Sequence, residues 1–391
     1  MQEAYIVAGY RTAVGKAGRG GFKYMPPVDL AKEVIDHLLK SVPELDPERI
    51  DDLIVGNAVP EAEQGLQMAR WVAVRALPIG VPAVTVNRYC GSGVETISMA
   101  TAKIKAGMAD CIMAGGTESM SLVPTVGYKT VPNYHVAKEW PEYYLGMGHT
   151  AEKIAQTYSI SREQADQFAY DSHQKALNAI EKGYFKEGIV PVEVEEVYFA
   201  GGKKQSKTFT VDTDEGPRAD TSLEVLGKLR PAFSMGGVVT AGNSSQTSDG
   251  AAFAIVMSEK MVKELNLTPI ARMITCASAG VDPSLMGMGP VTAIPKALKQ
   301  AGMKLDDIDL IELNEAFAAQ ALAVIQEAGL DPEKVNINGG GVALGHPLGC
   351  TGTKLTVQVL NDLRRANKKY GMVTACIGGG QGIAGIYELL N

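Results

Sequence analysis

Cys90 lies between a strand-like and a helix-like segment of the chain. Pro82 to Val86 is apolar and rich in β-branched residues, whereas Val94 to Lys105 repeats apolar residues at helical spacing. A thiol at a helix start lies near unpaired N–H groups and the positive end of the helix dipole, and both favour the reactive thiolate. We therefore predict that Cys90 is a nucleophile. The alternative is a small buried hydrophobic residue, which is the usual state of a free cysteine.

Two polar residues stand at strand-to-helix junctions in the C-terminal third of the chain. Asn314 opens the run Asn314 to Phe317, where an amide can hold a water or an oxygen or, alternatively, cap the next helix. His346 lies between Gly345 and Pro347, and proline is common in the first helical turn, so we expect the imidazole at a helix start. Histidine titrates near neutrality and can exchange a proton with a thiol, although a lone histidine is often structural.

Glycine-rich turns accompany these polar residues. Asn336 to Gly341 predicts a tight turn that lets the backbone approach a ligand, which alone is a weak indication. Cys376 ends a strand-like segment and is followed by the turn Gly378 to Gly382. Its thiol can act as an acid or a base, and the N–H groups of the turn can bind an oxyanion. The alternative is a core cysteine at a bend.

Taken together and in this order, the segments resemble the thiolase family, and the resemblance extends over the whole chain. It implies the thiolase fold, an α/β fold of two similar βα-layered halves packed as a five-layer αβαβα sandwich with an inserted loop domain. The motifs that carry the resemblance are Arg11–Lys16, Asn87–Gly93, Thr240–Ser245, Asp249–Ala252, Asn314–Phe317, Gly345–Gly349 and Cys376–Gly380.

The resemblance also implies a reaction and a set of roles. Thiolases cleave 3-ketoacyl-CoA with a second CoA, or run the reverse Claisen condensation of two acetyl-CoA molecules. Cys90 would take the acyl group as a thioester, His346 would activate it, and Cys376 would move the proton at the α-carbon of acetyl-CoA. Asn314 would hold a water that forms one oxyanion hole together with His346. The backbone N–H groups of Cys90 and Gly378 would form a second hole for the tetrahedral oxygen.

CoA and acyl-CoA are expected as substrates, with no tightly bound cofactor and no metal. By resemblance, Arg218 contacts the adenine end of CoA and Ser245 its pantetheine arm, whereas Phe233, Met147 and Met286 line the pocket. Several basic residues of the inserted unit either add positive field for the phosphates or are ordinary surface: Lys203, Lys204, Lys207, Lys228 and Arg230.

Alternating strand and helix signals at both ends of the chain predict three units. Residues 1–117 with 246–268 form the half that carries Cys90, residues 118–245 form the inserted CoA-binding loop domain with one clear helix over 162–182, and residues 269–391 form the second half. In that second half we expect a helix over 316–329 and a strand over 335–337. The two halves repeat one pattern of strand, turn, helix and glycine-ended strand, which indicates a duplicated unit with the chemistry at its junction.

Composition excludes several other classes. The net charge is −7, from 37 basic and 44 acidic residues, and without a basic tract it argues against nucleic-acid binding. No apolar run approaches the roughly 18 residues of a membrane span, so we expect no membrane insertion. Five scattered cysteines form no C-x-x-C pair, and the first residues resemble neither a signal nor a transit peptide. These features predict a cytoplasmic protein.

Departures from the biosynthetic pattern decide the expected branch. Gly146 stands where acetyl-specific thiolases usually have histidine, Arg88 and Tyr89 replace their Lys-Val, and Val225 replaces a serine near the CoA. We therefore expect degradative cleavage of 3-ketoacyl-CoA in fatty acid β-oxidation, with acetyl-CoA C-acetyltransferase as the alternative. A β-ketoacyl synthase would lack the second cysteine, and a non-catalytic acyl-CoA-binding relative would have lost a catalytic residue. The resemblance further implies a homodimer or homotetramer and leaves open a β-oxidation multienzyme partner.

Overall fold

Two groups of strands with the same internal order form the centre of the computed structural model, which describes residues 2–391. The first group comprises β1 (Ala4–Thr12), β3 (Asp52–Gly56), β4 (Ala83–Val86), β5 (Cys111–Ser119) and β9 (Ser248–Ser258). The second group comprises β10 (Ala271–Gly280), β11 (Leu310–Leu313), β12 (Tyr370–Ile377) and β13 (Gln381–Leu389).

The pairing of the strands repeats from one half to the other. In the first half β3 pairs in parallel with β4 and β5, and β9 pairs antiparallel with β5 and β1. In the second half β11 pairs in parallel with β12 and bridges Val335, and β13 pairs antiparallel with β12 and β10. A single pair of residues, Ile6 and Ala271, joins β1 to β10. This repetition confirms the two similar halves that were predicted.

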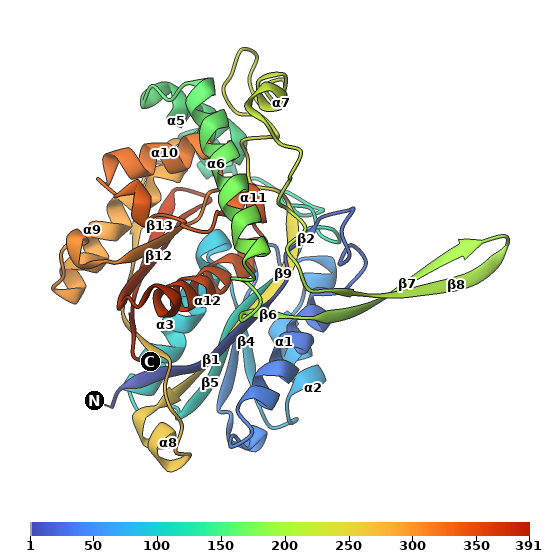
Figure 1. Ribbon diagram of the computed structural model, residues 1–391, viewed down its shortest axis with the longest axis vertical. Coiled ribbons are helices and arrows are strands. Elements are labelled where there is room, and N and C mark those ends of the chain that lie inside the picture. The colour runs from blue at the N-terminus through green and yellow to red at the C-terminus, as the bar shows by residue number, and fades with distance from the viewer. Residues whose placement is uncertain (1) are drawn as a thin grey trace.

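Helices separate and cover the two sheets in five layers, as Figure 1 shows. The outer face of the first sheet carries α1 (Pro27–Ser41) and α2 (Met68–Ala76). Between the two sheets lie α3 (Ser92–Lys105) and α12 (Leu348–Ala366). The outer side of the second sheet is covered by α9 (Gly289–Ala301) and α10 (Ala318–Glu327). The remaining short helix of the first half is α8 (Glu259–Glu264).

Alternation along the strands fills the spaces between these layers. Leu53 and Val55 of β3 point into the outer apolar cluster with α1 and α2, whereas Ile54 between them points into the central cluster with α3 and α12. A third cluster joins the second sheet to α9 and α10. Each fully buried aliphatic side chain contributes roughly 1.5–3 kcal/mol to the stability of the fold. The central layer of α3 and α12 is therefore held in place by its packing against both sheets.

The two central helices touch backbone to backbone at their N-terminal ends. A Cβ on Gly93 of α3 would overlap the amide nitrogen of Thr353, and a Cβ on Gly352 of α12 would overlap that of Val94. Only glycine permits such an approach. Because Cys90 and the Gly345–Pro347 turn each directly precede one of these helices, the crossing brings both segments to one end of the central layer.

The inserted region contains more regular structure than the single predicted helix. That helix is observed as α6 (Arg162–Glu181). A long hairpin of β7 and β8 projects from the rest of the chain in Figure 1. The other elements of this region are α4 (Tyr134–Glu139), α5 (Met147–Thr157), β6 (Ile189–Val190), β7 (Val192–Ala200), β8 (Lys203–Val211) and α7 (Leu223–Gly227). Two further short elements lie outside this region, namely β2 (Gly15–Lys16) and α11 (Gly341–Leu344). The exact domain boundaries stay a prediction.

Two element predictions are wrong in detail. The strand expected over residues 335–337 is reduced to the bridge at Val335, because Asn336 adopts φ 46° and turns the chain away. The helix expected over residues 316–329 begins only at Ala318, since the preceding residues are tied in extended form to Ser244 and Ser245. Within residues 2–391, no helix is long and apolar enough to cross a membrane. In the same residues no group of His, Cys, Asp and Glu side chains is arranged to hold a metal ion.

Candidate active site

Cys90 occupies a short 3₁₀ turn, Tyr89–Gly91, immediately before α3. Tyr89 has φ 43°, a left-handed conformation that is strained for an aromatic residue and projects the next side chain out of the turn. The turn is held because Asn87 Oδ1 accepts from the Tyr89 N–H at 2.9 Å and Ser92 Oγ accepts from the Arg88 N–H at 2.9 Å. The sharp turn therefore presents the half-buried Cys90 thiol to the space in front of the helix.

The protonation of Cys90 corrects one expectation. Burial raises the pKa of the Cys90 thiol to about 12, although its own N–H and that of Gly378 act in the opposite direction. The helix start thus works as expected on the thiol, but desolvation outweighs it. The resting residue is a neutral thiol, and it needs a base before it can attack.

Cys376 lies at the end of β12, close to Cys90. The Cys90 turn abuts this strand, because a Cβ on Gly91 would lie only 2.8 Å from Ile377 Cδ1. Burial raises the pKa of the Cys376 thiol, and the neighbouring Cys90 raises it further. Cys376 also belongs to a buried apolar cluster, composed with it of Ala151, Val239, Met286, Ala316 and Phe317, against which Met147 packs. The structure therefore brings both thiols and Gly378 together beside an apolar pocket wall.

Asn314 and His346 form a second buried pair. Asn314 directly follows β11, and its Nδ2 lies 3.2 Å from His346 Nε2. On the other side of the ring, Nδ1 lies 2.6 Å from the Thr351 hydroxyl, which itself donates to the carbonyl of Pro347 at 2.9 Å. That hydroxyl has one proton, so His346 Nδ1–H must be the donor to Thr351, and Nε2 is left as an acceptor. Asn314 is therefore not a helix cap, and the N-cap of α10 is Phe317.

The environment keeps His346 neutral at physiological pH. Burial lowers the pKa of its imidazole to about 3, and the nearby Lys354 adds to this effect. A neutral ring with an unprotonated Nε2, which accepts only from the Asn314 amide, can accept a proton from a thiol that displaces this contact. Within residues 2–391, Cys90 Sγ makes no hydrogen bond to this ring. Cys90 instead packs against an apolar cluster of Ala58, Val59, Val123 and Leu348, the last of which follows His346 by two residues.

The buried carboxylate of Glu118 joins the two halves at this point. Its Oε2 accepts from the N–H groups of Ala58 and Gly349, both at 2.8 Å, and its Oε1 accepts from Asn57 and Gln64. Since Gly349 follows His346 by three residues, Glu118 fixes the start of α12 against the first half. Glu118 was not predicted from the sequence, where its one signal is an acidic side chain at the end of an apolar strand.

Glu315 has a matching role beside Asn314. Its carboxylate accepts from Ser172 Oγ at 2.8 Å, from Asn336 Nδ2 at 2.8 Å and from the Val342 N–H at 3.2 Å. A Cβ on Gly340 would overlap this carboxylate, which explains the glycines of the turn that was predicted to approach a ligand. The turn therefore packs against Glu315 and holds the segment that leads to His346.

Arg88 connects the turn of Cys90 to that of Cys376. Its Nη1 donates to Gln381 Oε1 at 3.1 Å, and its Nε forms an ion pair with Glu95 of α3 at 2.9 Å. Arg88 is one of the positions at which the sequence departs from the biosynthetic pattern. These contacts help to fix the position of the Cys90 N–H relative to that of Gly378.

The residues predicted to bind CoA are only partly gathered around these thiols. Met147 and Met286 lie in the cluster of Cys376, and Phe233 stacks edge-to-face on Phe317 with the ring centroids 6.1 Å apart. Ser245 donates its N–H to the carbonyl of Ala316 at 2.9 Å and so lies beside the same segment. Arg218 is exposed and paired with Asp220 at 3.2 Å. Lys203, Lys204 and Lys207 lie on the projecting hairpin and are not gathered at this site (Figure 1).

Comparison with known families agrees with this geometry. A family model of the thiolase N-terminal domain matches residues 4–260, and a model of the thiolase C-terminal domain matches residues 267–389. The chain belongs to the thiolase family. Both halves of the thiolase fold, and with them every residue discussed above, lie within the two matched regions.

Individual thiolases resemble the chain over its full length. It is 53% identical to a 3-ketoacyl-CoA thiolase of Bacillus subtilis (strain 168), with 100% of both chains covered. It is 44% identical to an acetyl-CoA acetyltransferase of Pseudomonas aeruginosa, with 98% of both covered. Among solved structures, a Bacillus anthracis acetyl-CoA acetyltransferase superposes with TM-score 0.90 at 40% identity, covering 100% of this chain and 99% of the other. Human mitochondrial 3-ketoacyl-CoA thiolase gives TM-score 0.88 at 40% identity with the same coverage.

Proposed function

We propose that this thiolase cleaves 3-ketoacyl-CoA with CoA, giving acetyl-CoA and a shortened acyl-CoA through an acyl-Cys90 intermediate. One observation carries the proposal: the turn that bears Cys90 packs on the end of β12, where a Cβ on Gly91 would lie 2.8 Å from Ile377 Cδ1 and one on Gly378 would lie 3.8 Å from Tyr89 Cδ2, so the thiols of Cys90 and Cys376 gather with the N–H groups of Cys90 and Gly378. A nucleophile, a second proton carrier and two converging donors are what acyl transfer to and from a thioester requires.

The first half-reaction begins with proton transfer from Cys90 to Nε2 of His346, which at rest accepts from the Asn314 amide and must exchange that contact for the thiol. The thiolate attacks the 3-keto carbonyl, and the N–H groups of Cys90 and Gly378 stabilise the tetrahedral oxygen. The bond between C2 and C3 then breaks, and its electron pair leaves as the enolate of acetyl-CoA. His346, now protonated, and Asn314 with its water stabilise the enolate oxygen, while Cys376 donates its proton to C2.

The second half-reaction transfers the acyl group to CoA. Cys376, now a thiolate, removes the proton of the incoming CoA thiol, and the resulting CoA thiolate attacks the acyl-Cys90 thioester. The same two N–H groups stabilise the second tetrahedral oxygen. Collapse of this intermediate expels the Cys90 thiolate, which recovers its proton from His346, and releases the shortened acyl-CoA. All groups thereby return to their starting protonation states.

The degradative direction is supported by two observations. The relative that shares 53% identity is a 3-ketoacyl-CoA thiolase, and the sequence departs from the biosynthetic pattern at Arg88, Tyr89 and Gly146. Arg88 is not a neutral replacement, because it links the turns of Cys90 and Cys376. The second candidate, synthesis of acetoacetyl-CoA from two acetyl-CoA molecules, is favoured by the relatives named acetyl-CoA acetyltransferase.

The test compares kcat/KM for the thiolysis of acetoacetyl-CoA with that of 3-ketoacyl-CoA substrates of eight to sixteen carbons. Comparable or higher values for the longer chains support the degradative proposal. A sharp preference for acetoacetyl-CoA would support the biosynthetic candidate instead. A Cys90→Ser variant controls for contaminating activity, because it should lose most turnover with every substrate.

We also propose that the active form is a homodimer or homotetramer. Strand β4 lies at one edge of the strand order and is only half-buried, so its outer hydrogen-bonding groups can pair with another strand. Val74 and Ile79, on the elements that precede β4, are 53% and 73% exposed. Sedimentation velocity tests this, and a monomer that is fully active at micromolar concentration would contradict it. We propose separately that the protein binds a β-oxidation multienzyme partner. Sedimentation velocity of the protein in a cell extract tests this.

A further inference from the structure

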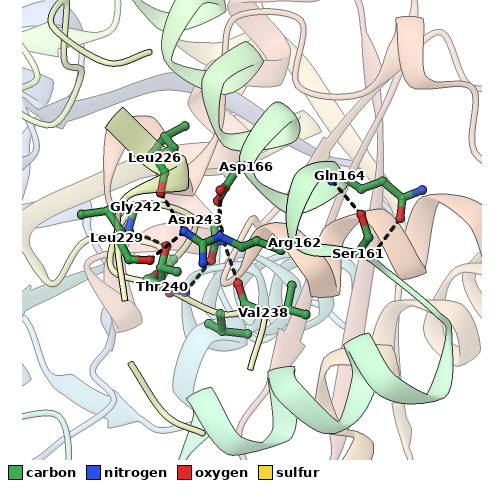
Figure 2. A network of polar contacts seen from close by, with 12 residues as sticks. Ser161, Arg162, Gln164, Asp166, Leu226, Leu229, Val238, Thr240, Gly242 and Asn243 are labelled. Carbon is green, nitrogen blue, oxygen red and sulfur yellow. Dashed lines mark hydrogen bonds and ion pairs between the residues drawn. The ribbon is translucent and has the colours of Figure 1, made fainter. Parts of the chain in front are cut away.

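A guanidinium at the start of α6 closes the end of another helix. Arg162 Nε donates to Asp166 Oδ2 at 2.7 Å, one turn further along α6. Its Nη2 donates to the carbonyls of Leu226 and Leu229 at 2.7 and 2.9 Å, as Figure 2 shows. These carbonyls belong to the last turn of α7 and the residues after it, where the Leu226 carbonyl also accepts from the Leu229 N–H at 3.0 Å, so Arg162 adds a side-chain donor to the end of this helix. Arg162 therefore ties α6 to the beginning of the segment that follows α7.

The other oxygen of Asp166 ties α6 to the end of the same segment. Asp166 Oδ1 accepts from Asn243 Nδ2 at 2.8 Å, and Asn243 Oδ1 accepts from the Thr240 N–H at 2.8 Å (Figure 2). The carbonyl of Asn243 accepts from the N–H of Ala318, the first residue of α10, at 2.9 Å. Asp166 and Asn243 are only 4% and 1% exposed. Asn243 is thus the point at which α6, the 238–243 turn and α10 meet.

The segment between these two ties forms a wall of the candidate site. Val239 lies in the apolar cluster of Cys376, and Phe233 stacks on Phe317. Ser245 follows two residues after Asn243 and is the residue expected at the pantetheine arm. A second anchor exists, because Glu152 of α5 accepts from the N–H groups of Val238 and Val239, both at 2.9 Å. Loss of the ties to α6 should therefore shift the wall without unfolding it.

We propose that Arg162, Asp166 and Asn243 are positioning residues that set the place of the 229–245 segment and thereby the affinity of the site for CoA thioesters. They touch none of the reacting thiols. The inference rests on the proposed function, since it assigns a substrate-binding role to this wall. Asp166 holds one end of the segment through Arg162 and the other through Asn243. Both contacts therefore depend on its carboxylate.

The test uses Asp166→Asn and Arg162→Gln, with Gln164→Ala as the matched control. Gln164 and Ser161 form the capping box at the start of the same helix, with reciprocal bonds of 2.8 and 3.2 Å, and do not reach the segment (Figure 2). Asp166→Asn should raise KM for acetoacetyl-CoA about tenfold or more while kcat stays within about twofold. Gln164→Ala should lower Tm and leave KM unchanged, and Arg162→Lys should restore part of the loss seen with glutamine.

A second readout separates this inference from the proposed function. Alkylation of Cys90 by iodoacetamide needs no CoA site, so its rate should not change in the variants, whereas protection by free CoA should need a roughly tenfold higher concentration. If wild-type protein shows no thiolysis but CoA protection is weakened in Asp166→Asn, the positioning role stands and the proposed reaction falls. An unchanged KM and unchanged protection, or a parallel fall of kcat and alkylation rate, would overturn the inference. If Asp166→Asn does not fold, the comparison of Arg162→Lys with Arg162→Gln decides in the same way.

Discussion

The hydroxyl of Thr351 selects the tautomer of His346, and its removal should be felt in catalysis. The hydroxyl accepts from Nδ1–H at 2.6 Å and donates to the Pro347 carbonyl at 2.9 Å, so Nε2 is unprotonated and can take the Cys90 proton in place of its contact with the Asn314 amide. Thr351→Val keeps the shape of the side chain but removes the acceptor. A buried N–H without a partner costs about 1–3 kcal/mol, and moving the ring proton to Nε2, with the Asn314 amide turned so that its oxygen accepts from Nε2–H, avoids that cost. The variant ring would then offer no base to Cys90.

The expected loss follows from that energy. Since about 1.4 kcal/mol is a factor of ten, the productive tautomer should become about 5- to 150-fold rarer, and kcat for thiolysis should fall by the same factor. The assay is steady-state thiolysis of acetoacetyl-CoA at saturating CoA, together with the rate of Cys90 alkylation at pH 7. Both should fall, because both require the thiol proton to leave.

The serine variant is the control for this prediction. Thr351→Ser loses a methyl group but keeps the hydroxyl, so kcat should remain within about threefold of wild type. The reasoning about the tautomer fails if Thr351→Val turns over at the wild-type rate, or if the serine variant loses as much activity as the valine variant.

Three further predictions concern residues around this centre. Arg88→Met should lower kcat about three- to tenfold with little change in Tm, because the turn of Gly378 loses its tether through Gln381; steady-state kinetics and a thermal melt check both parts. Glu315→Gln should lower both kcat and Tm, since an amide group would face one of the three buried donors; equal Tm values for variant and wild type would contradict this. Burial lowers the pKa of His173 to about 4 from its ordinary 6.5, so between these values the unfolded chain binds the extra proton and His173 destabilises the fold as the pH falls. In His173→Asn the loss of Tm between pH 6.5 and 4 should therefore be smaller than in wild type, as scanning calorimetry can measure.

Local patterns were sufficient for most of the fold. The alternating and helical periodicities of the two ends predicted the strands and helices of both halves, because each element buries one face in a single interlayer space. The repetition of the halves was also visible, although the strand over 335–337 was not confirmed. There an asparagine with φ 46° ends the pairing after one bridge, and hydrophobic periodicity carries no signal for such a conformation.

The sequence identified only those site residues that are marked by their immediate neighbours in the chain. Cys90, His346 and Cys376 stand out because each lies within two residues of glycine or proline at the end of a strand or the start of a helix. Glu118 and Thr351 do not stand out, since their roles arise from partners that only folding brings together. The local features that favour a thiolate at Cys90 are outweighed for a related reason: the desolvation that raises its pKa comes from surrounding layers that the local sequence does not reveal.

The most direct test of the whole account is the site of acylation. Protein incubated with acetoacetyl-CoA without free CoA, quenched in acid and digested should carry an acyl group on the peptide that contains Cys90, by mass spectrometry. The label should disappear in Cys90→Ala, and in Cys376→Ser it should still form on the Cys90 peptide but more slowly, because Cys376 protonates C2 in the acylation step. A label on the peptide of Cys376, or an active enzyme with no acyl intermediate on Cys90, would contradict the account.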